Sequence, residues 1–286
     1  MASTLFVSLV DGLLIGFVYG IAAMGLTLIW GVMRVINLAH GAIIALGMFG
    51  VYLLFSTLGL NPYLGIVLSA LVGLVGGMLI YTIAIQRVIN APYLSTLLAT
   101  FAINMIIIGL GTAAFSTSPR TVDFSLGSVS VGPATLQGTR LIAALAATLV
   151  TAALYMFLYR TRPGKHIRAV ANNRAAAELM GISSKRILAL SFGLGTMLAA
   201  ISGGLIATFF PVTILSGNAY QLKSFVIGVL GGLGNPLGAL LGGLILGSLE
   251  GVIPVFMKNT WVPVIEFLLF VLILLVRPSG LFGAKK

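Results

Sequence analysis

Long apolar runs separated by short polar breaks make up most of this chain. A membrane-spanning helix needs about 20 predominantly apolar residues, and runs of about that length recur from one end to the other. They predict spans at 6–29, 40–58, 63–85, 92–115, 140–160, 188–210, 220–234, 236–256 and 261–276. The last run before the C-terminal span, 220–256, is too long for one helix and barely long enough for two. Because Gly234-Asn235-Pro236 interrupts it, the pattern predicts eight or nine spans.

One long stretch, 160–186, is continuously polar and basic, and it holds seven of the sixteen Lys and Arg residues. Basic loops between spans lie on the cytoplasmic side, so we expect this loop there. Counting spans outward from it, with the break at 234–236 taken as a turn, places twelve basic residues inside and four outside. The four outside are Arg120, Arg140, Lys223 and Lys258, and those added inside are Arg34, Arg87, Arg277, Lys285 and Lys286. This asymmetry predicts an external N-terminus and a cytoplasmic C-terminus.

The basic loop also has the signals of a short helix. Asn172 or Asn173 can serve as an N-cap, Ala175 to Glu178 are good helix formers, and Gly181 stands where a C-cap glycine would. We expect a helix of about two turns lying outside the membrane. The alternative is an ordinary cytoplasmic loop whose charges only fix the topology.

The composition agrees with an integral membrane protein and excludes several classes of function. The chain is 59% hydrophobic and 7% charged, which leaves too little charge for the surface of a soluble domain. Its net charge of +11 is concentrated in one loop beside the spans, so we expect no nucleic-acid partner. With no cysteine and two histidines, a metal site is not expected. The sequence has no P-loop, nucleophile elbow or zinc-protease motif, so we expect no enzyme.

Polar side chains inside the predicted spans are the candidates for a translocation path. Thr96, Thr100 and Asn104 recur every four residues and so share one helix face, which either bonds to a neighbouring helix or lines a wet cavity. Asn37 and His40 lie near the predicted inner boundary, where they either mark the membrane edge or form part of the path or its inner gate.

The acids Glu250 and Glu266 are the only ones predicted within spans. A bonded structural acid near a helix end and a proton relay are the two alternatives for each. Glu250 is kept among the path candidates.

The segment from Ala169 to Ile187 has the pattern A-x-x-x-x-R-A-A-A-E-L-M-G-I-x-x-x-R-I, which resembles the coupling loop of ABC importer permeases, specifically the branched-chain amino acid permease family. Four other segments agree with that family in the same order. They are GVMRVINLAHGAIIALG at 31–47, SFVIGVLGGLGNPLG at 224–238, GALLGGLILGSLE at 238–250 and RPSGLFG at 277–283.

This resemblance implies an all-α polytopic bundle like that of type II ABC importers, with residues 1–286 as one transmembrane permease domain and a cytoplasmic coupling loop at 160–187. It implies import of amino acids, most often leucine, isoleucine or valine, across a bacterial inner membrane, although similar permeases carry other amino acids, urea or short amides. The alternative is an ion-coupled secondary transporter or channel for small polar solutes.

The partners that the resemblance implies are a second, related permease subunit, two ABC ATPase subunits, an external substrate-binding protein and the lipid bilayer. ATP and Mg would be used by the ATPase subunits, with no cofactor bound by this chain. The residues that would dock on the ATPase are Arg174, Ala175, Ala176, Ala177, Glu178, Met180, Gly181 and Ile182. Arg174 and Glu178 are expected to pair on the exposed face of the helix.

Overall fold

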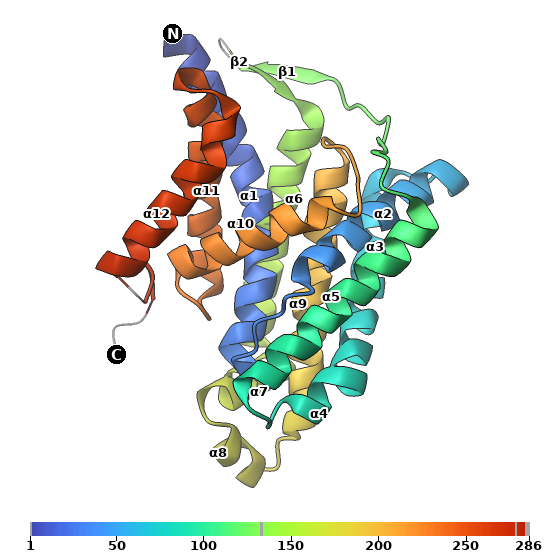
Figure 1. The fold of residues 1–286 in the computed structure, drawn as a ribbon, viewed down its shortest axis with the longest axis vertical. Coiled ribbons are helices and arrows are strands. Elements are labelled where there is room, and N and C mark those ends of the chain that lie inside the picture. The colour runs from blue at the N-terminus through green and yellow to red at the C-terminus, as the bar shows by residue number, and fades with distance from the viewer. Residues whose placement is uncertain (1, 132–133, 278, 284–286) are drawn as a thin grey trace.

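The computed structural model describes residues 2–131, 134–277 and 279–283, and it is a bundle of membrane-length helices (Figure 1). Its helices are α1 (Ala2–Met33), α2 (His40–Leu58), α3 (Pro62–Ile80), the π-helix η1 (Tyr81–Ile85), α4 (Gln86–Val88), α5 (Tyr93–Phe115), α6 (Gly138–Arg160), α7 (Arg162–Asn172), α8 (Arg174–Leu179), α9 (Ser184–Ala207), α10 (Ser216–Gly231), α11 (Pro236–Phe256), the 3₁₀ turn η2 (Asn259–Trp261) and α12 (Val262–Val276). A hairpin of β1 (Ser128–Val131) and β2 (Ala134–Gln137) lies at one end, with Ser128 opposite Gln137. The bundle confirms the predicted class.

α10 differs from the other long helices in its length. Within the described ranges, eight helices are long and apolar enough to cross a membrane, and α10, with 16 residues, is not among them. The predicted span at 220–234 was therefore wrong in its bounds. The break after it is a true turn, because Gly232 and Gly234 both have positive φ and the Asn235 side chain caps α11 by accepting a hydrogen bond from the Gly238 N–H. α10 is a short helix that runs obliquely across the bundle (Figure 1).

Two parts of the chain are built alike but run in opposite directions. α1 descends through the bundle in Figure 1, residues 34–39 turn back into its interior, and α2 starts there; α9 ascends, residues 208–215 turn back, and α10 starts there. α11 then packs along α1, just as α3 packs along α9. The structure therefore has two inverted halves, each containing a helix that begins inside the bundle.

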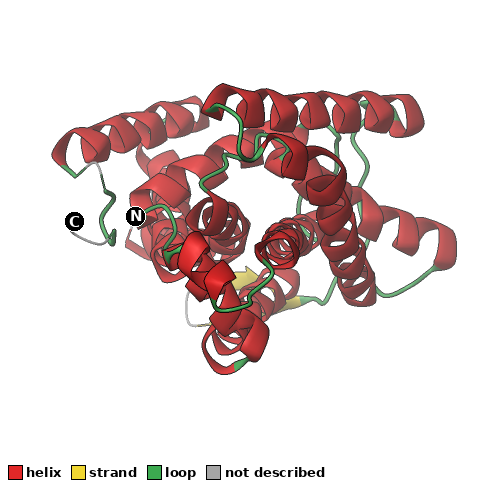
Figure 2. Ribbon diagram, turned by 90° about the horizontal axis from the view of Figure 1, so that it is seen from below, coloured by secondary structure: helices red, strands yellow, loops and turns green. Residues whose placement is uncertain are grey.

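Small residues let these helices approach closely. Gly16 of α1 and Gly243 and Gly247 of α11 face one another, with no room for a Cβ atom between the two backbones. These glycines therefore form the packing surface between α1 and α11, as is usual where helices associate in a bilayer. Seen from below, two long helices run along one edge of the bundle, while several others are seen nearly end-on (Figure 2).

The start of α1 and the polar loop lie at opposite ends of the bundle. The N-terminus and the β hairpin are at one end of the bundle, and α7 and α8 are at the other (Figure 1). The turn at 232–235 is at that second end too, because its residues line one pocket with Arg168 and Ala171 of α7. Lys285 and Lys286 lie outside the described residues.

Candidate functional site: a junction of two half-helices and an exposed terminal helix

The starts of α2 and α10 meet in the middle of the bundle. Gly41 and Gly217 touch through their backbones, and neither position has room for a Cβ atom. The Gln221 side chain crosses this junction: its Oε1 accepts a hydrogen bond from the Gly41 N–H at 2.6 Å, and its Nε2 lies 3.4 Å from the Asn37 carbonyl oxygen. Because the first N–H groups of a helix have no partner within it, this side chain satisfies one that would otherwise be orphaned.

Asn37 and His40 are completely buried at this junction. The Asn37 side-chain oxygen accepts from the Ala39 N–H at 3.1 Å, and His40 Nε2 lies 2.8 Å from the carbonyl oxygen of Ala22 in α1. Asn37 Nδ2 and His40 Nδ1 are buried with no hydrogen-bond partner among the described residues. The hydrogen bonds of Asn37 and His40 therefore hold the returning segment in place. One nitrogen atom of each side chain can still bond another group.

The polar face predicted on the fourth span is directed into the protein. Thr96, Thr100 and Asn104 are buried in α5, whereas most of its other residues are exposed or half-buried. Thr100 donates a hydrogen bond to the Ile36 carbonyl in the returning segment at 3.1 Å, and Thr96 donates to the Tyr93 carbonyl of its own helix. Asn104 makes no side-chain hydrogen bond to a residue that the structure describes. Bonding to a neighbouring segment therefore explains why Thr100 is polar and buried. Asn104 remains the candidate for a residue that lines the translocation path.

Glu250 belongs to a second polar cluster, which is joined to the junction through α10. Its carboxylate pairs with Lys223 Nζ at 2.6 Å, and the Tyr19 hydroxyl lies 3.4 Å away. Lys223 Nζ also lies 4.7 Å from the centre of the Tyr19 ring. Lys223 was counted among the outside basic residues, but it is a bonded residue inside the bundle, and the pairing alternative holds for Glu250. Glu266 in α12 is separately buried.

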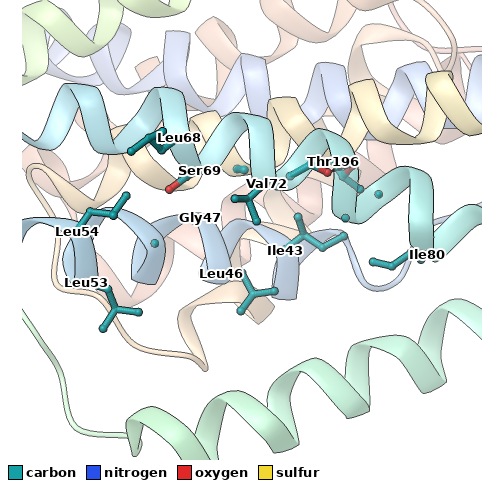
Figure 3. A pocket seen from close by; sticks show the side chains of 15 residues that line it. Ile43, Leu46, Gly47, Leu53, Leu54, Leu68, Ser69, Val72, Ile80 and Thr196 are labelled. Atoms are coloured by element: carbon teal, nitrogen blue, oxygen red, sulfur yellow. Dashed lines mark hydrogen bonds between the residues drawn. The ribbon is translucent and has the colours of Figure 1, made fainter. Parts of the chain in front are cut away.

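A groove on the flank of the bundle has too few polar groups to bind a polar solute. It encloses ≈ 390 Å³ between α2, α3 and α9, with Leu46, Leu54 and Leu68 on its walls (Figure 3). Ser69 and Thr196 are its polar residues, and the Thr196 hydroxyl already donates to the Gly73 carbonyl. This surface suits hydrocarbon chains and not an amino acid.

The polar loop forms two short helices instead of the single one predicted. Thr161 caps α7 by accepting from the Gly164 N–H, and Asn173 caps α8 by accepting from the Ala176 N–H at 3.0 Å. Gly181 ends α8 with a φ of 81°, as predicted. Because both helices, α7 and α8, are capped by side chains from the loop itself, the segment has a fixed shape.

One face of α8 and the turn after it project from the end of the bundle. Leu179 is 89% exposed and Met180 is 82% exposed. Arg174 Nε pairs with Glu178 at 3.2 Å, as expected, and Arg174 Nη1 lies 3.4 Å from Asn90 Oδ1. The nearby Ser184 hydroxyl and the Arg174 guanidinium hold the pKa of the Glu178 carboxyl below its ordinary value.

Two of the predicted docking residues are differently placed from what the sequence suggested. Ala177 is buried, and Ile182 packs against the core and not outward, so neither presents a surface to a partner. Ala175 and Ala176 are exposed, as is Gly181. Leu179 was missed, although its position beside Met180, just before the C-cap glycine, could have identified it as an apolar side chain with no neighbour to pack on.

Comparison with known proteins places the whole chain in one group. The family described as the permease component of the branched-chain amino acid transport system matches residues 8–276. The high-affinity branched-chain amino acid transport system permease protein LivH of Salmonella typhimurium is 31% identical, over 96% of this chain and 94% of that protein. The corresponding permease protein BraD of Pseudomonas aeruginosa is 28% identical over the same shares.

A solved structure shares the fold. The structure of PsaBC from Streptococcus pneumoniae in complex with Fab superposes with a TM-score of 0.50, covering 94% of this chain and 91% of that chain. At 13% sequence identity this likeness concerns the arrangement of helices alone.

Proposed function

The chain belongs to the family of permease components of branched-chain amino acid transport systems, and on that premise we propose that it is the transmembrane subunit of an ATP-driven importer of leucine, isoleucine or valine. The proposal that transport is driven by ATP rests on helix α8, which is capped and exposed and from which Leu179 and Met180 project. Since the sequence has no P-loop, ATP and Mg would be bound by separate ATPase subunits.

The rest of the assembly follows from the same proposal. Two ATPase subunits dock at the end that carries α7 and α8, a second permease subunit packs beside this one in a bacterial inner membrane, and an external binding protein docks at the hairpin end. Substrate would pass near the junction of α2 and α10, where Asn37, His40 and Asn104 offer polar groups. An alternating movement of the two inverted halves about this junction would open it to one side at a time.

Uptake by the reconstituted assembly tests this function. The chain, its ATPase subunits, a second permease and the binding protein are placed in proteoliposomes, and labelled leucine is supplied on the side of the binding protein. We expect uptake only with MgATP on the ATPase side. Uptake driven by a proton or sodium gradient without ATP would support the ion-coupled alternative and overturn the proposal.

The orientation can be measured by cysteine labelling, because the chain has no cysteine of its own. Ser184, at the start of α9, is buried, so the exposed neighbouring residue Ser183 is the proper probe at the α8 end. We expect an impermeant maleimide to label Ser183→Cys only from the cytoplasm and Ser128→Cys only from outside. Labelling of Ser183→Cys from outside would reverse the topology and remove the basis for docking of the ATPase.

The α5 face can be divided into a bonding residue and a lining residue. We expect Asn104→Leu to lower uptake while the free energy of unfolding stays within about 0.5 kcal/mol of wild type, since no hydrogen bond to a described residue is lost. Thr100→Val removes the bond to Ile36 and should lower stability by about 1 kcal/mol. Normal uptake by Asn104→Leu would show that this face does not border the path.

A further inference from the structure

A groove rich in cations lies where α7 meets the first turn of α9 and the π-helix that continues α3. It has a volume of ≈ 610 Å³. Arg162 and His166 come from α7, and Lys185 and Arg186 come from α9. We call these four residues and the space between them the basic groove.

No acid lines the basic groove, and Glu178, whose carboxyl feels the charge of Lys185, is already paired with Arg174. It contains five Asp and Glu residues, and three of them are paired elsewhere: Asp11 with Arg140, Glu178 with Arg174 and Glu250 with Lys223. The other two are distant by position, since Asp123 precedes the hairpin and Glu266 is buried in α12.

Arg162, Lys185 and Arg186 accordingly form no ion pair or side-chain hydrogen bond with any residue that the structure describes. Three exposed cations around one hollow repel one another unless an anion is supplied from outside.

The floor of the basic groove is apolar and belongs to the spanning helices. Met78 of α3 and Leu190 of α9 are half-buried there. On the adjoining surface of α3 and η1, Val75, Leu79 and Ile83 are more than half exposed, as side chains that face hydrocarbon are. The groove thus opens toward the membrane as well as toward water.

We propose that the basic groove binds an anionic glycerophospholipid from the leaflet at the α7 and α8 end. The headgroup phosphate contacts Arg162, Lys185 and Arg186, and an acyl chain lies over Met78 and Leu190. Basic pockets between spanning helices select anionic headgroups in this way. A free phosphate would leave the apolar floor unused, and an acidic protein segment would have to lie at the depth of the spans.

Such a lipid would join α7 to the start of α9. These two elements flank α8, so the lipid composition of the leaflet would influence how firmly α8 is held. This inference concerns the chain itself and does not depend on the proposed substrate or on the presence of an ATPase.

Native mass spectrometry of the full chain in a neutral detergent tests the proposal. The protein is titrated with dioleoyl phosphatidylglycerol, with dioleoyl phosphatidylcholine and with inorganic phosphate. The groove variant is Arg162→Gln with Lys185→Gln. The matched control is Arg34→Gln with Arg277→Gln, two exposed basic residues at the same end of the bundle but outside the groove.

We expect wild type to bind phosphatidylglycerol about tenfold more tightly than phosphatidylcholine, and the groove variant to lose about 10- to 30-fold in affinity for the anionic lipid. The control should keep its affinity within about threefold. Equal binding of the two lipids, an equal loss in the control, or displacement of phosphatidylglycerol by equimolar inorganic phosphate would each overturn the proposal. So would a groove variant that binds lipid normally and fails only to bind an ATPase subunit.

Discussion

Replacement of Leu179 and Met180 together by serine is expected to abolish stable association with the ATPase subunits and to leave the membrane bundle folded. Both side chains are more than four-fifths exposed, so their removal should change the free energy of unfolding by less than about 0.5 kcal/mol. Apolar anchors at the centre of an interface contribute about 2 kcal/mol or more each, so losing two should weaken binding by a factor of about 1000.

Co-purification of the ATPase with a tagged permease measures this effect, and thermal unfolding of the permease serves as the check on its fold. The matched control is Leu126→Ser with Val129→Ser, two exposed apolar residues at the hairpin end. That variant should bind the ATPase normally. Undiminished association and ATP-driven uptake in the Leu179 and Met180 variant would contradict a coupling role for α8.

Other substitutions in this segment are less informative for a structural reason. Ala177 is buried, so Ala177→Trp would overpack the base of α8 and could disturb the fold and the coupling together. At Gly181 nothing lies within 4 Å of the position a Cβ would take, so Gly181→Val mainly strains a left-handed backbone, at a cost of about 1 kcal/mol or more. Leu179 and Met180 separate the two effects because they contact so little of their own chain.

The sequence predicted the ends of most helices because local residues mark where they begin and end. The predicted spans at 92–115 and 261–276 match α5 and α12 to within about a residue, since Pro92 and the 3₁₀ turn at 259–261 mark where each begins. The caps at Asn173 and Gly181 were likewise predictable, because each rests on local backbone chemistry.

How deeply a residue lies within the bundle could not be predicted from the sequence in the same way. Asn37 and His40 follow an apolar run and resemble the polar end of a span, yet the chain turns inward there. Two of its backbone carbonyls, those of Asn37 and Ile36, accept hydrogen bonds from Gln221 and Thr100, which are remote in the sequence. A hydropathy pattern gives the length of a segment, but it does not show which distant side chain completes its hydrogen bonds. Lys223 was assigned to the outside for the same reason.

The pair formed by Lys223 and Glu250 is where the ATP-driven and ion-coupled functions differ most. An ion-coupled transporter needs an intramembrane charge that binds and releases its ion. Here the carboxylate is held by Lys223 at 2.6 Å, which favours a role in fixing α10 against α11. The side chains of Lys223 and Glu250 are 19% and 26% exposed, so neither charge is well solvated alone.

Lys223→Met is therefore expected to destabilise the protein by about 2 kcal/mol, because it leaves the Glu250 carboxylate unpaired among helices. The figure is below that for fully buried pairs, since both side chains retain some contact with solvent. Tyr19→Phe is the mild comparison: it removes the two 3.4 Å contacts of the hydroxyl, with Glu250 and with Lys223 Nζ, and should cost about 0.5 kcal/mol. Unfolding of the purified chain in detergent measures both.

Adding Glu250→Gln to Lys223→Met should restore most of the lost stability, since no unpaired charge then remains in the bundle. If the pair only positions α10, the double variant should also import leucine with ATP at close to the wild-type rate. A double variant that is as stable as wild type but no longer transports would instead assign Glu250 to the translocation path. Loss of uptake together with the loss of any effect of the membrane proton gradient would identify Glu250 as the site of ion coupling.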